Sequence, residues 1–432
     1  MRRLYFAIIL GALLLSGCVN KGFDDISNAK SDITFEVGDF VQFGASQTRI
    51  IGTPDIGKTA WDVGDKLLVV TDAGSSTTLT YTADYKWVAD CTLGGLNEQS
   101  EIAVTYAPNC ALTAGVITPQ ESLPLGTGEY YTTEATLSGN TVTISFADAA
   151  RTYSRLRIAG LENQTLTVTT TGFTPAGATE VATAAYTLTT DNNGNAFLYG
   201  VFAEGATVSV KQGDITLKDY TFTAEKNPNG TEYNKSYALD ATPVIDGTLG
   251  GKDTAEESDI TALVEQLKAY VDNGITTIIV PGSEPALIEM DSWTNTVIGE
   301  AIYRLSKEES YNGKIDLILP DVTEIFDQEF HSARALNSIT LAKVTKLADQ
   351  AFYGTLYLRT ITFGSVITEV NELGAIFNQV GYKVGGCDLI LNCGQMNESN
   401  VPAPDLTNNI WKFKFENEFK SITLTHTDEC GH

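Results

Sequence analysis

Basic residues and histidines are scarce in this chain of 432 residues, and each shortage excludes a class of function. The sequence holds 28 lysines and arginines against 54 aspartates and glutamates, which gives a formal net charge of −26. A surface of that sign repels phosphate backbones and anionic membrane surfaces, so nucleic acid is not an expected partner. The three histidines are His331, His426 and His432, and no CxxC pair accompanies them. Neither a zinc site nor any other cofactor is therefore predicted.

Sequence motifs of catalysis are also missing. The chain contains no GxSxG, no HExxH, no Walker loop and no GxGxxG after a predicted strand. Adjacent carboxylates occur at Asp24 and Asp25, in a predicted polar tether, and at Glu308 and Glu309, in a predicted helix. Contact with water explains their presence there without a catalytic role. Two carboxylates that only the fold brings together would escape this search. We predict that the protein is not an enzyme.

The N-terminus has the features of an export signal. Arg2 and Arg3 precede an apolar run over residues 4–15, which ends at Ser16-Gly17-Cys18. A run of about 12 residues is too short to span a bilayer as a helix, so residues 1–18 are predicted to be a removed signal peptide. This segment resembles a bacterial lipoprotein signal with its lipobox. The resemblance implies that Cys18 is acylated; an ordinary signal peptide before a free cysteine is the alternative.

Residues 19–32 are polar enough to form a tether between that anchor and the folded chain. Asp24 and Asp25 resemble the surface-export signals of some outer-membrane lipoproteins. We therefore expect a protein that is lipid-anchored in the outer membrane and faces the extracellular side, with no membrane contact except through its anchor.

Five cysteines follow Cys18, and an oxidising compartment favours disulfide pairing. Cys91 and Cys110 are the preferred pair, because both lie in one stretch of predicted strands. A disulfide closing that loop would add about 3 kcal/mol of stability. Cys387 and Cys393 would lie about 20 Å apart on an extended strand, so they are a weaker choice.

Residues 33 to about 245 have the pattern of an all-β region. Short runs of alternating threonine, valine, tyrosine and phenylalanine are separated by turns rich in Gly, Asn and Asp. Strands are predicted over residues 67–70, 79–82, 102–106, 141–146 and 166–169. The length exceeds one typical sandwich, so we divide it after the prolines at 119 and 124, into domains over residues 33–120 and 121–248.

Several short motifs in this region occur in the order found in the fimbrillin-like family. Trp61 precedes Gly64-Asp65 and a hydrophobic strand, and Tyr106-Ala107-Pro108, Phe146-Ala147-Asp148 and Leu156-Arg157-Ile158 follow. The resemblance covers roughly residues 33–245. It implies two tandem β-sandwiches, as in the lipoprotein pilins and adhesins of anaerobic Gram-negative bacteria. Trp61 itself is predicted to be a core aromatic beside the turn at Gly64 and Asp65.

The same resemblance implies a processing event. Some family members are trimmed after an arginine near the start of the first domain, which opens a groove for a donor strand from another pilin subunit. Arg49, which precedes Ile50, is the candidate here. The alternative is that Arg49 simply ends a strand.

The composition changes at residues 246–253, a predicted linker to a third domain over residues 249–432. Thr254 and Glu257 have the spacing of a capping box, and the residues at 260, 263, 264, 267 and 271 form one apolar helical face. Strands over 275–280 and 315–319 flank a second helix near residues 294–306. These elements are predicted to cap the N-terminal end of a repeat stack.

The repeats follow a fixed step of 22 residues. Leu317, Ile339 and Ile361 are spaced by it, since 339 − 317 and 361 − 339 are both 22, and Phe330 matches Phe352. This period predicts one short strand and one helical turn per repeat, stacked so that each unit buries the next. The segments resemble leucine-rich repeats of the bacterial surface-antigen (BspA) type.

The third cycle of the repeat is irregular. Val370 falls one residue late against Leu347, and no phenylalanine follows it at the expected step. Residues 386–425 are predicted to form the closing cap. The fold class expected for the whole chain is thus mainly β: two tandem fimbrillin-like β-sandwiches, then a short α/β leucine-rich-repeat domain.

These features together predict a surface-anchored cell-adhesion or interaction lipoprotein, as a fimbrial tip or accessory subunit. Its partner would be a host or bacterial surface protein, bound by the repeat domain, or other pilin subunits. The alternative is a glycan-binding outer-membrane lipoprotein whose exposed aromatics stack on sugars; Trp87, Trp293 and Trp411 are the candidates.

Overall fold

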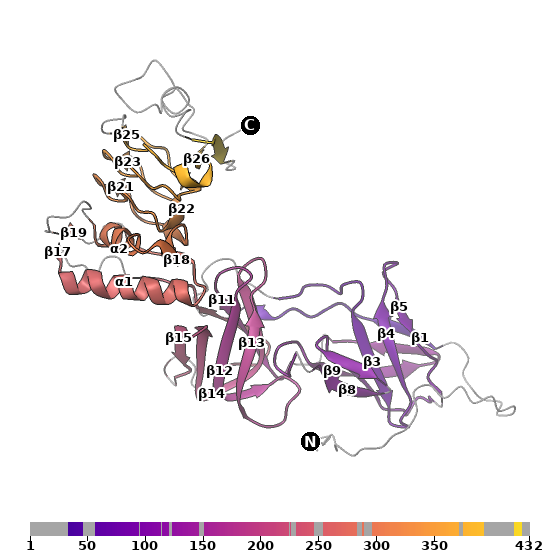
Figure 1. Cartoon of the computed structure of the whole chain (residues 1–432). Coiled ribbons are helices and arrows are strands. Elements are labelled where there is room, and N and C mark those ends of the chain that lie inside the picture. The colour runs from indigo at the N-terminus through magenta and orange to yellow at the C-terminus, as the bar shows by residue number, and fades with distance from the viewer. Residues whose placement is uncertain are drawn as a thin grey trace. The chain divides into compact units, whose positions relative to one another are not determined.

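The prediction of a mainly β chain is confirmed by the computed structural model (Figure 1). The structure describes residues 33–45, 57–94, 96–113, 115–120, 123–146, 151–223, 225, 230–245, 254–282, 287–288, 296–370, 375–392 and 419–425. The chain divides into two units. Unit 1 comprises Met1–Val210 and Lys218–Ala241, and unit 2 comprises Lys211–Leu217 and Thr242–His432.

The first sheet of unit 1 has seven strands in the order β1-β10-β9-β6-β3-β4-β5, and only the β1–β10 pair is parallel. Its strands are β1 (Thr34–Val37), β3 (Lys66–Thr71), β4 (Ser76–Tyr81), β5 (Trp87–Ala89), β6 (Ile102–Tyr106), β9 (Tyr131–Ser138) and β10 (Thr141–Ile144). Alternate residues such as Leu67, Val69 and Val104 are fully buried. The apolar alternation in the sequence therefore produces this core.

The second sheet, which belongs mostly to unit 1, also has seven strands, in the order β13-β12-β14-β11-β16-β2, with β15 paired to β14. They are β2 (Gly44–Ala45), β11 (Ser154–Ala159), β12 (Thr165–Pro175), β13 (Ala182–Thr189), β14 (Asn195–Gln212), β15 (Ile215–Thr221) and β16 (Lys235–Asp240). Within β14, Gly200 is required because a Cβ there would lie 2.3 Å from the Phe173 ring. Gly205 has a φ of +78°, a backbone conformation that side chains disfavour.

The predicted boundary at residue 120 does not match the sheets. Strands β9 and β10 lie beyond it, yet β9 pairs with β6 in the first sheet. The prolines that suggested a linker lie partly in a hairpin of β7 (Cys110–Thr113) and β8 (Val116–Pro119), where Pro119 pairs with Cys110. The change of sheet therefore falls between Ile144 and Ser154.

Six parallel strands form the main sheet of unit 2, in the order β18-β20-β22-β24-β26-β27. They are β18 (Thr277–Ile279), β20 (Ile315–Leu319), β22 (Leu336–Leu341), β24 (Thr360–Phe363), β26 (Asp388–Asn392) and β27 (Ser421–Thr425). Leu317 pairs with Ile339, and Ile339 pairs with Ile361. The step of 22 residues read from the sequence is therefore the strand register.

A second, three-stranded parallel sheet contains β21 (Glu324–Ile325), β23 (Lys346–Leu347) and β25 (Glu369–Val370). Val370 pairs with Leu347 despite its late position in the sequence. Each of the two full repeats ends in a segment of turns, over residues 326–335 and 348–357. The sequence predicts one helical turn in each of these places. A short pair of strands, β17 (Thr254–Ala255) and β19 (Leu287–Ile288), is separate from both sheets.

Stacked phenylalanines run through the core of the repeats. Phe330 lies over Phe352 and Phe352 over Phe377, each pair with ring centroids 5.7 Å apart. Phe377 is the partner that the sequence did not reveal, since it follows Phe352 by 25 residues and not by 22. Likewise β26, predicted to belong to a closing cap, continues the main sheet through the Ile361–Leu389 pair.

Two α-helices occur among the described residues, α1 (Glu257–Asp272) and α2 (Val297–Leu305), with short 3₁₀ turns at η1 (Glu309–Tyr311) and η2 (Tyr382–Val384). The capping box of α1 joins Glu256 and Asp259, so the predicted pair of Thr254 and Glu257 is wrong by two residues. In the part of the chain that the structure describes, neither helix has the length and apolar character needed to cross a membrane.

A buried carboxyl group joins α2 to the first repeat. The Phe326 amide donates to Glu329 Oε2 at 2.9 Å, and the Thr296 hydroxyl donates to Oε1 at 3.1 Å. Thr296 in turn accepts the Gly299 amide as the N-cap of α2. Glu329 is completely buried, and this burial raises the pKa of its carboxyl group to about 7.

Glu329 predicts a pH-dependent stability for unit 2. The unfolded chain loses this proton near pH 4.5 while the folded chain keeps it to about pH 7. Unfolding therefore releases a proton in this window, and the free energy of unfolding falls as the pH rises through it, by about 3 kcal/mol in all. Glu329→Gln should remove that fall. Urea unfolding from pH 4.5 to 8, followed by hydrogen exchange in residues 296–330, measures it.

The matched control for this variant is Glu309→Gln, at an exposed carboxylate of the same unit. It should keep the pH dependence of the wild type. An unchanged slope in Glu329→Gln would contradict the assignment of this titration to Glu329.

Candidate functional site

The outward face of the main sheet in unit 2 presents two aligned columns of side chains, which we call the repeat face. Because the strands pair in register, equivalent residues lie beside one another across six strands. The first column is Thr277, Asp316, Ser338, Thr360, Asp388 and Ser421. The second column is Ile279, Ile318, Thr340, Thr362, Ile390 and Thr423. Thr423 is exposed and the others are half-buried, whereas the residues between the columns fill the core.

Hydrogen bonds fix the polar column at two places. Asp316 Oδ1 accepts from the Ser338 hydroxyl at 2.6 Å and from the Asn337 side-chain amide at 2.8 Å. Asp388 Oδ1 accepts from the Ser421 hydroxyl at 2.6 Å. That hydrogen bond, with Lys420 nearby, holds the pKa of Asp388 below its usual range. The second and fifth positions of the column therefore carry oriented acceptors before any partner binds.

The second column contains only β-branched residues, whose χ1 angles are restricted. Isoleucine contributes apolar contact, and each threonine contributes a methyl group and a hydroxyl group that donates and accepts. Restricted side chains lose little entropy when a partner immobilises them. This arrangement can form contacts and hydrogen bonds. Nothing in it activates a nucleophile.

Unit 1 holds a second notable arrangement, in which residues 33–45 supply an edge strand to both of its sheets. β1 pairs in parallel with β10, and β2 pairs in parallel with β16. Between these two strands, Phe40 and Phe43 are 6% and 2% exposed. One short segment is thus inserted into both sheets.

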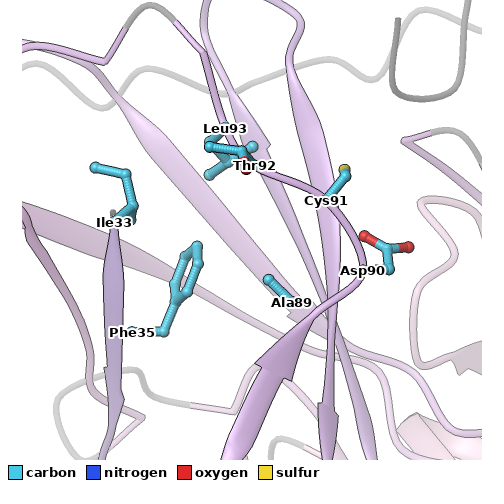
Figure 2. Close-up of a pocket in the computed structure, with 7 residues that line it drawn as sticks. All are labelled: Ile33, Phe35, Ala89, Asp90, Cys91, Thr92 and Leu93. Carbon is cyan, nitrogen blue, oxygen red and sulfur yellow. The ribbon is translucent and has the colours of Figure 1, made fainter. Parts of the chain in front are cut away.

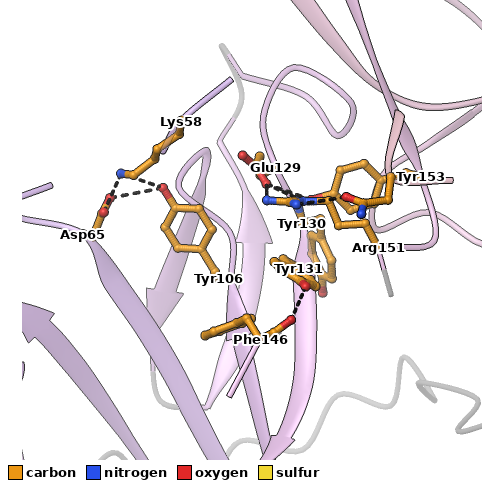
Figure 3. Close-up of polar contacts among 10 residues, drawn as sticks. Lys58, Asp65, Tyr106, Glu129, Tyr130, Tyr131, Phe146, Arg151 and Tyr153 are labelled. Carbon is orange, nitrogen blue, oxygen red and sulfur yellow. Dashed lines mark hydrogen bonds and ion pairs between the residues drawn. The ribbon is translucent and has the colours of Figure 1, made fainter. Parts of the chain in front are cut away.

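A buried ion pair of Arg151 and Glu129 (Figure 3) contacts that segment through the ring of Phe43. Arg151 Nε donates to Glu129 Oε2 at 3.1 Å, and the Tyr153 hydroxyl donates to the same oxygen at 3.2 Å. The guanidinium group lies 4.2 Å from the ring centroid of Phe43 and 4.6 Å from that of Tyr131. Burial raises the pKa of Glu129, and Arg151 opposes that change. Arg151 Nη2 also lies 3.0 Å from Glu129 Oε2 as an ion pair, although this nitrogen makes no hydrogen bond.

Trp61, predicted to be a core aromatic, is half-buried and packs against the core of the first sheet within an aromatic cluster. Its ring contacts those of Phe40, Trp87, Tyr106 and Phe146 at centroid distances between 4.8 and 5.4 Å. Its indole N–H donates to the Gly38 carbonyl at 2.9 Å. The cluster therefore also anchors the N-terminal segment.

The turn beside Trp61 is fixed by Asp65. This carboxylate accepts from Lys58 at 2.5 Å and from the Tyr106 hydroxyl at 3.1 Å (Figure 3). Burial and the nearby Asp65 charge raise the pKa of Tyr106. Tyr106 therefore stays protonated at neutral pH and acts as a donor that orders this end of the first sheet.

A pocket of about 480 Å³ lies between β1 and the chain that follows β5 (Figure 2). It is lined by Ile33, Phe35, Ala89, Asp90, Cys91, Thr92 and Leu93. The Asp90 carboxylate already accepts from the Thr77 hydroxyl at 2.8 Å and the Thr78 amide at 2.9 Å. Asp90 is the one charged residue of this lining, and both of these donors bind its Oδ1. Among the described residues, no three His, Cys, Asp or Glu side chains are placed to hold a metal ion.

The predicted disulfide between Cys91 and Cys110 is wrong. Cys91 is disulfide-bonded, whereas Cys110 is a free, half-buried thiol. Cys110 begins β7 and pairs with Pro119, while Cys91 follows β5 at the edge of the first sheet. Sequence proximity in a β-rich stretch did not bring the two together.

Four other predicted residues lie outside the described part of the chain. Cys18 and Arg49, the sites proposed for acylation and trimming, are among them, as are Trp293 and Trp411. Sequence reasoning missed Arg151 and Glu129, because a buried ion pair leaves no periodic signal. Glu329 was missed for the same reason.

Comparison with known proteins gives only distant similarity. No protein-family model matches the sequence, and no match is found among curated proteins. A candidate cell adhesion protein from Bacteroides fragilis NCTC 9343 is 12% identical, with a TM-score of 0.30 over 49% of this chain and 92% of its own. One from Bacteroides ovatus ATCC 8483 is 11% identical, with a TM-score of 0.25 over 42% and 83%.

A leucine-rich repeat protein from Bacteroides thetaiotaomicron VPI-5482 is 9% identical, with a TM-score of 0.14 over 83% of this chain and 57% of its own. All three scores are too low to support an argument about the fold or the function of this chain.

The buried ion pair gives a prediction for unit 1. Arg151→Met leaves Glu129 buried without its cation, so unit 1 should lose about 3–5 kcal/mol of stability. Adding Glu129→Gln should restore most of that loss, because no uncompensated charge then remains. Chemical denaturation of the single and double variants measures both effects. The control is Arg359→Met, at an exposed arginine in unit 2. A loss no larger than the control's would show that the pair is unimportant.

Proposed function

We propose that this protein is a surface-anchored adhesion or interaction protein that binds its partner through the repeat face. The observation that supports this proposal is the alignment of two columns of side chains on the repeat face. One column presents hydroxyl and carboxylate groups, and the other presents isoleucine and threonine. The partner class we propose is a protein on a host or bacterial surface. Cys18 would be the lipid anchor, and the outer membrane, facing outward, the location.

The dimensions of the repeat face suit a macromolecular partner. Six strands at a spacing of about 4.8 Å give a width of about 24 Å across the sheet. This width is comparable with that of the surface that one partner contributes to a standard protein interface. The buried residues behind the face hold it rigid. It is also polar enough to remain in water without a partner, as a transient interface requires.

The fimbrial part of the proposal concerns Arg49. Trimming there would remove residues 33–45, and with them the strands β1 and β2 and the rings of Phe40 and Phe43. Strands β10 and β16 would each lose a paired neighbour, and a donor strand could then add to the open edge. This arrangement supports a role as a tip or accessory subunit, and trimming at Arg49 stays a prediction.

Adhesion through the repeat face can be tested with cells that display the full chain. Thr340→Lys with Thr362→Lys places two cations at the centre of the face. These cations should reduce attachment to epithelial cell layers or partner bacteria at least about tenfold, because central interface positions carry most of the binding energy. Attachment counts, normalised to surface display measured by antibody, give the result.

The matched control is Thr323→Lys with Thr368→Lys. Both threonines are exposed and precede β21 and β25, in the other sheet of the same repeats, so the charge change is identical. This control should attach like the wild type. Equal attachment by both double variants would contradict binding through the repeat face.

A further inference from the structure

The turn between β4 and β5 holds an exposed tyrosine in a strained backbone conformation. Tyr85 is 78% exposed and has a φ of 58°. Its amide donates to the Thr82 carbonyl at 2.9 Å, and the Thr82 amide donates to the Lys86 carbonyl at 2.9 Å. This tight hairpin turn therefore fixes Tyr85 in the left-handed region.

Glycine or asparagine is the favoured residue at such a position, because a Cβ in the left-handed region meets the backbone. A tyrosine there costs about 1 kcal/mol or more. Burial of the ring could offset that cost, but Tyr85 is among the most exposed large hydrophobic side chains of the described residues. Packing of the fold therefore gives no reason for this residue.

Tyr85 is the outermost member of a row of aromatic rings. Its ring centroid lies 6.4 Å from that of Tyr81, which lies 5.1 Å from Trp87. Trp87 then contacts Trp61 at 5.1 Å, within the aromatic cluster that anchors the N-terminal segment. Tyr81 and Trp87 pair across β4 and β5 and are both half-buried. The row thus runs from the rigid core of the first sheet to an exposed ring.

The turn carries groups of both charges. Asp84 and Lys86 flank Tyr85, and both are exposed. One acid and one base leave the turn without net charge, in a chain whose total is −26. An ionic partner would find no complementary field there, whereas a neutral partner with many hydroxyl groups would find an acceptor and a donor.

The size of the row decides between a protein and a smaller partner. A fully buried aromatic side chain covers about 150–250 Å², so three rings supply less than the roughly 1,000 Å² that a specific protein interface needs. Tyr81 and Trp87 supply even less, since they are already half-buried. The rings are inclined to one another, by 66° between Tyr85 and Tyr81 and by 41° between Tyr81 and Trp87. The row therefore offers separate aromatic faces, enough for the C–H faces of one or two sugar rings.

We propose that Tyr85, Tyr81 and Trp87 form a binding platform for a neutral carbohydrate chain, with Asp84 and Lys86 bonding to its hydroxyl groups. This platform lies in unit 1, whereas the repeat face lies in unit 2, so it adds to the proposed function and does not depend on it. The protein would then hold a glycan and a protein partner at separate sites.

Affinity electrophoresis of the full chain tests the platform. Native gels containing soluble mannan, xylan or mixed-linkage glucan should retard the protein in at least one case, and polygalacturonate should not. Tyr85→Gly should weaken binding to the retarding polysaccharide about tenfold or more, because one stacked ring is lost. The same substitution should raise the thermal unfolding temperature, because glycine relieves the left-handed strain.

Three controls make the result specific. Asn163→Gly relieves a left-handed residue with a φ of 56° elsewhere in unit 1 and should leave binding unchanged. Tyr382→Ala removes a 73% exposed tyrosine of unit 2 and should also bind normally. The Thr340→Lys, Thr362→Lys variant should keep its retardation, which separates this platform from the repeat face.

The proposal is overturned if no neutral polysaccharide retards the protein, if only the anionic one does, or if Tyr85→Gly migrates like the wild type. It is also overturned if Tyr85→Gly loses binding together with thermal stability, because the tyrosine would then serve the fold.

Discussion

The in-register parallel pairing of the strands in unit 2 is the constraint on which the candidate binding surface depends. Leu317, Ile339, Ile361 and Leu389 pair in sequence across the sheet, and the stacked phenylalanines lie in the core behind them. A shift of one residue in any strand would exchange its buried and outward side chains. The columns of the repeat face therefore exist only because the core fixes the register.

A comparable constraint acts in unit 1, where a short N-terminal segment completes two sheets at once. Phe40 and Phe43 are buried in it, and the cation of Arg151 lies against Phe43. Buried charges are costly unless they are paired and hydrogen-bonded, and here Glu129, Tyr153 and the aromatic faces supply the pairing. Removing the segment would expose that pair, so its presence and the stability of unit 1 are linked.

The sequence predicted what local periodicity determines. The strands at residues 102–106 and 315–319 have the predicted bounds, and the 22-residue step is the strand register. Phe377 was not predicted as a core residue, because extra residues in the third cycle interrupt the 22-residue spacing, although its ring stacks like those of the other phenylalanines. Strand β14 was not predicted, because Gly200 and Gly205 interrupt the alternation of apolar and polar residues along it. The pairing of Arg151 with Glu129 and the strained backbone of Tyr85 depend on tertiary contacts and turn geometry, which residue type alone does not specify.

Residue-resolved hydrogen exchange on the full chain measures this register most directly. Backbone amides that bond between strands, such as that of Asp388 to the Arg359 carbonyl at 2.7 Å, exchange only when the stack opens. Amides in β20, β22, β24 and β26 should therefore be protected to a similar degree and lose protection together as denaturant is added. Fast exchange in β26 while β22 and β24 stay protected would contradict a continuous in-register sheet, and with it the repeat face.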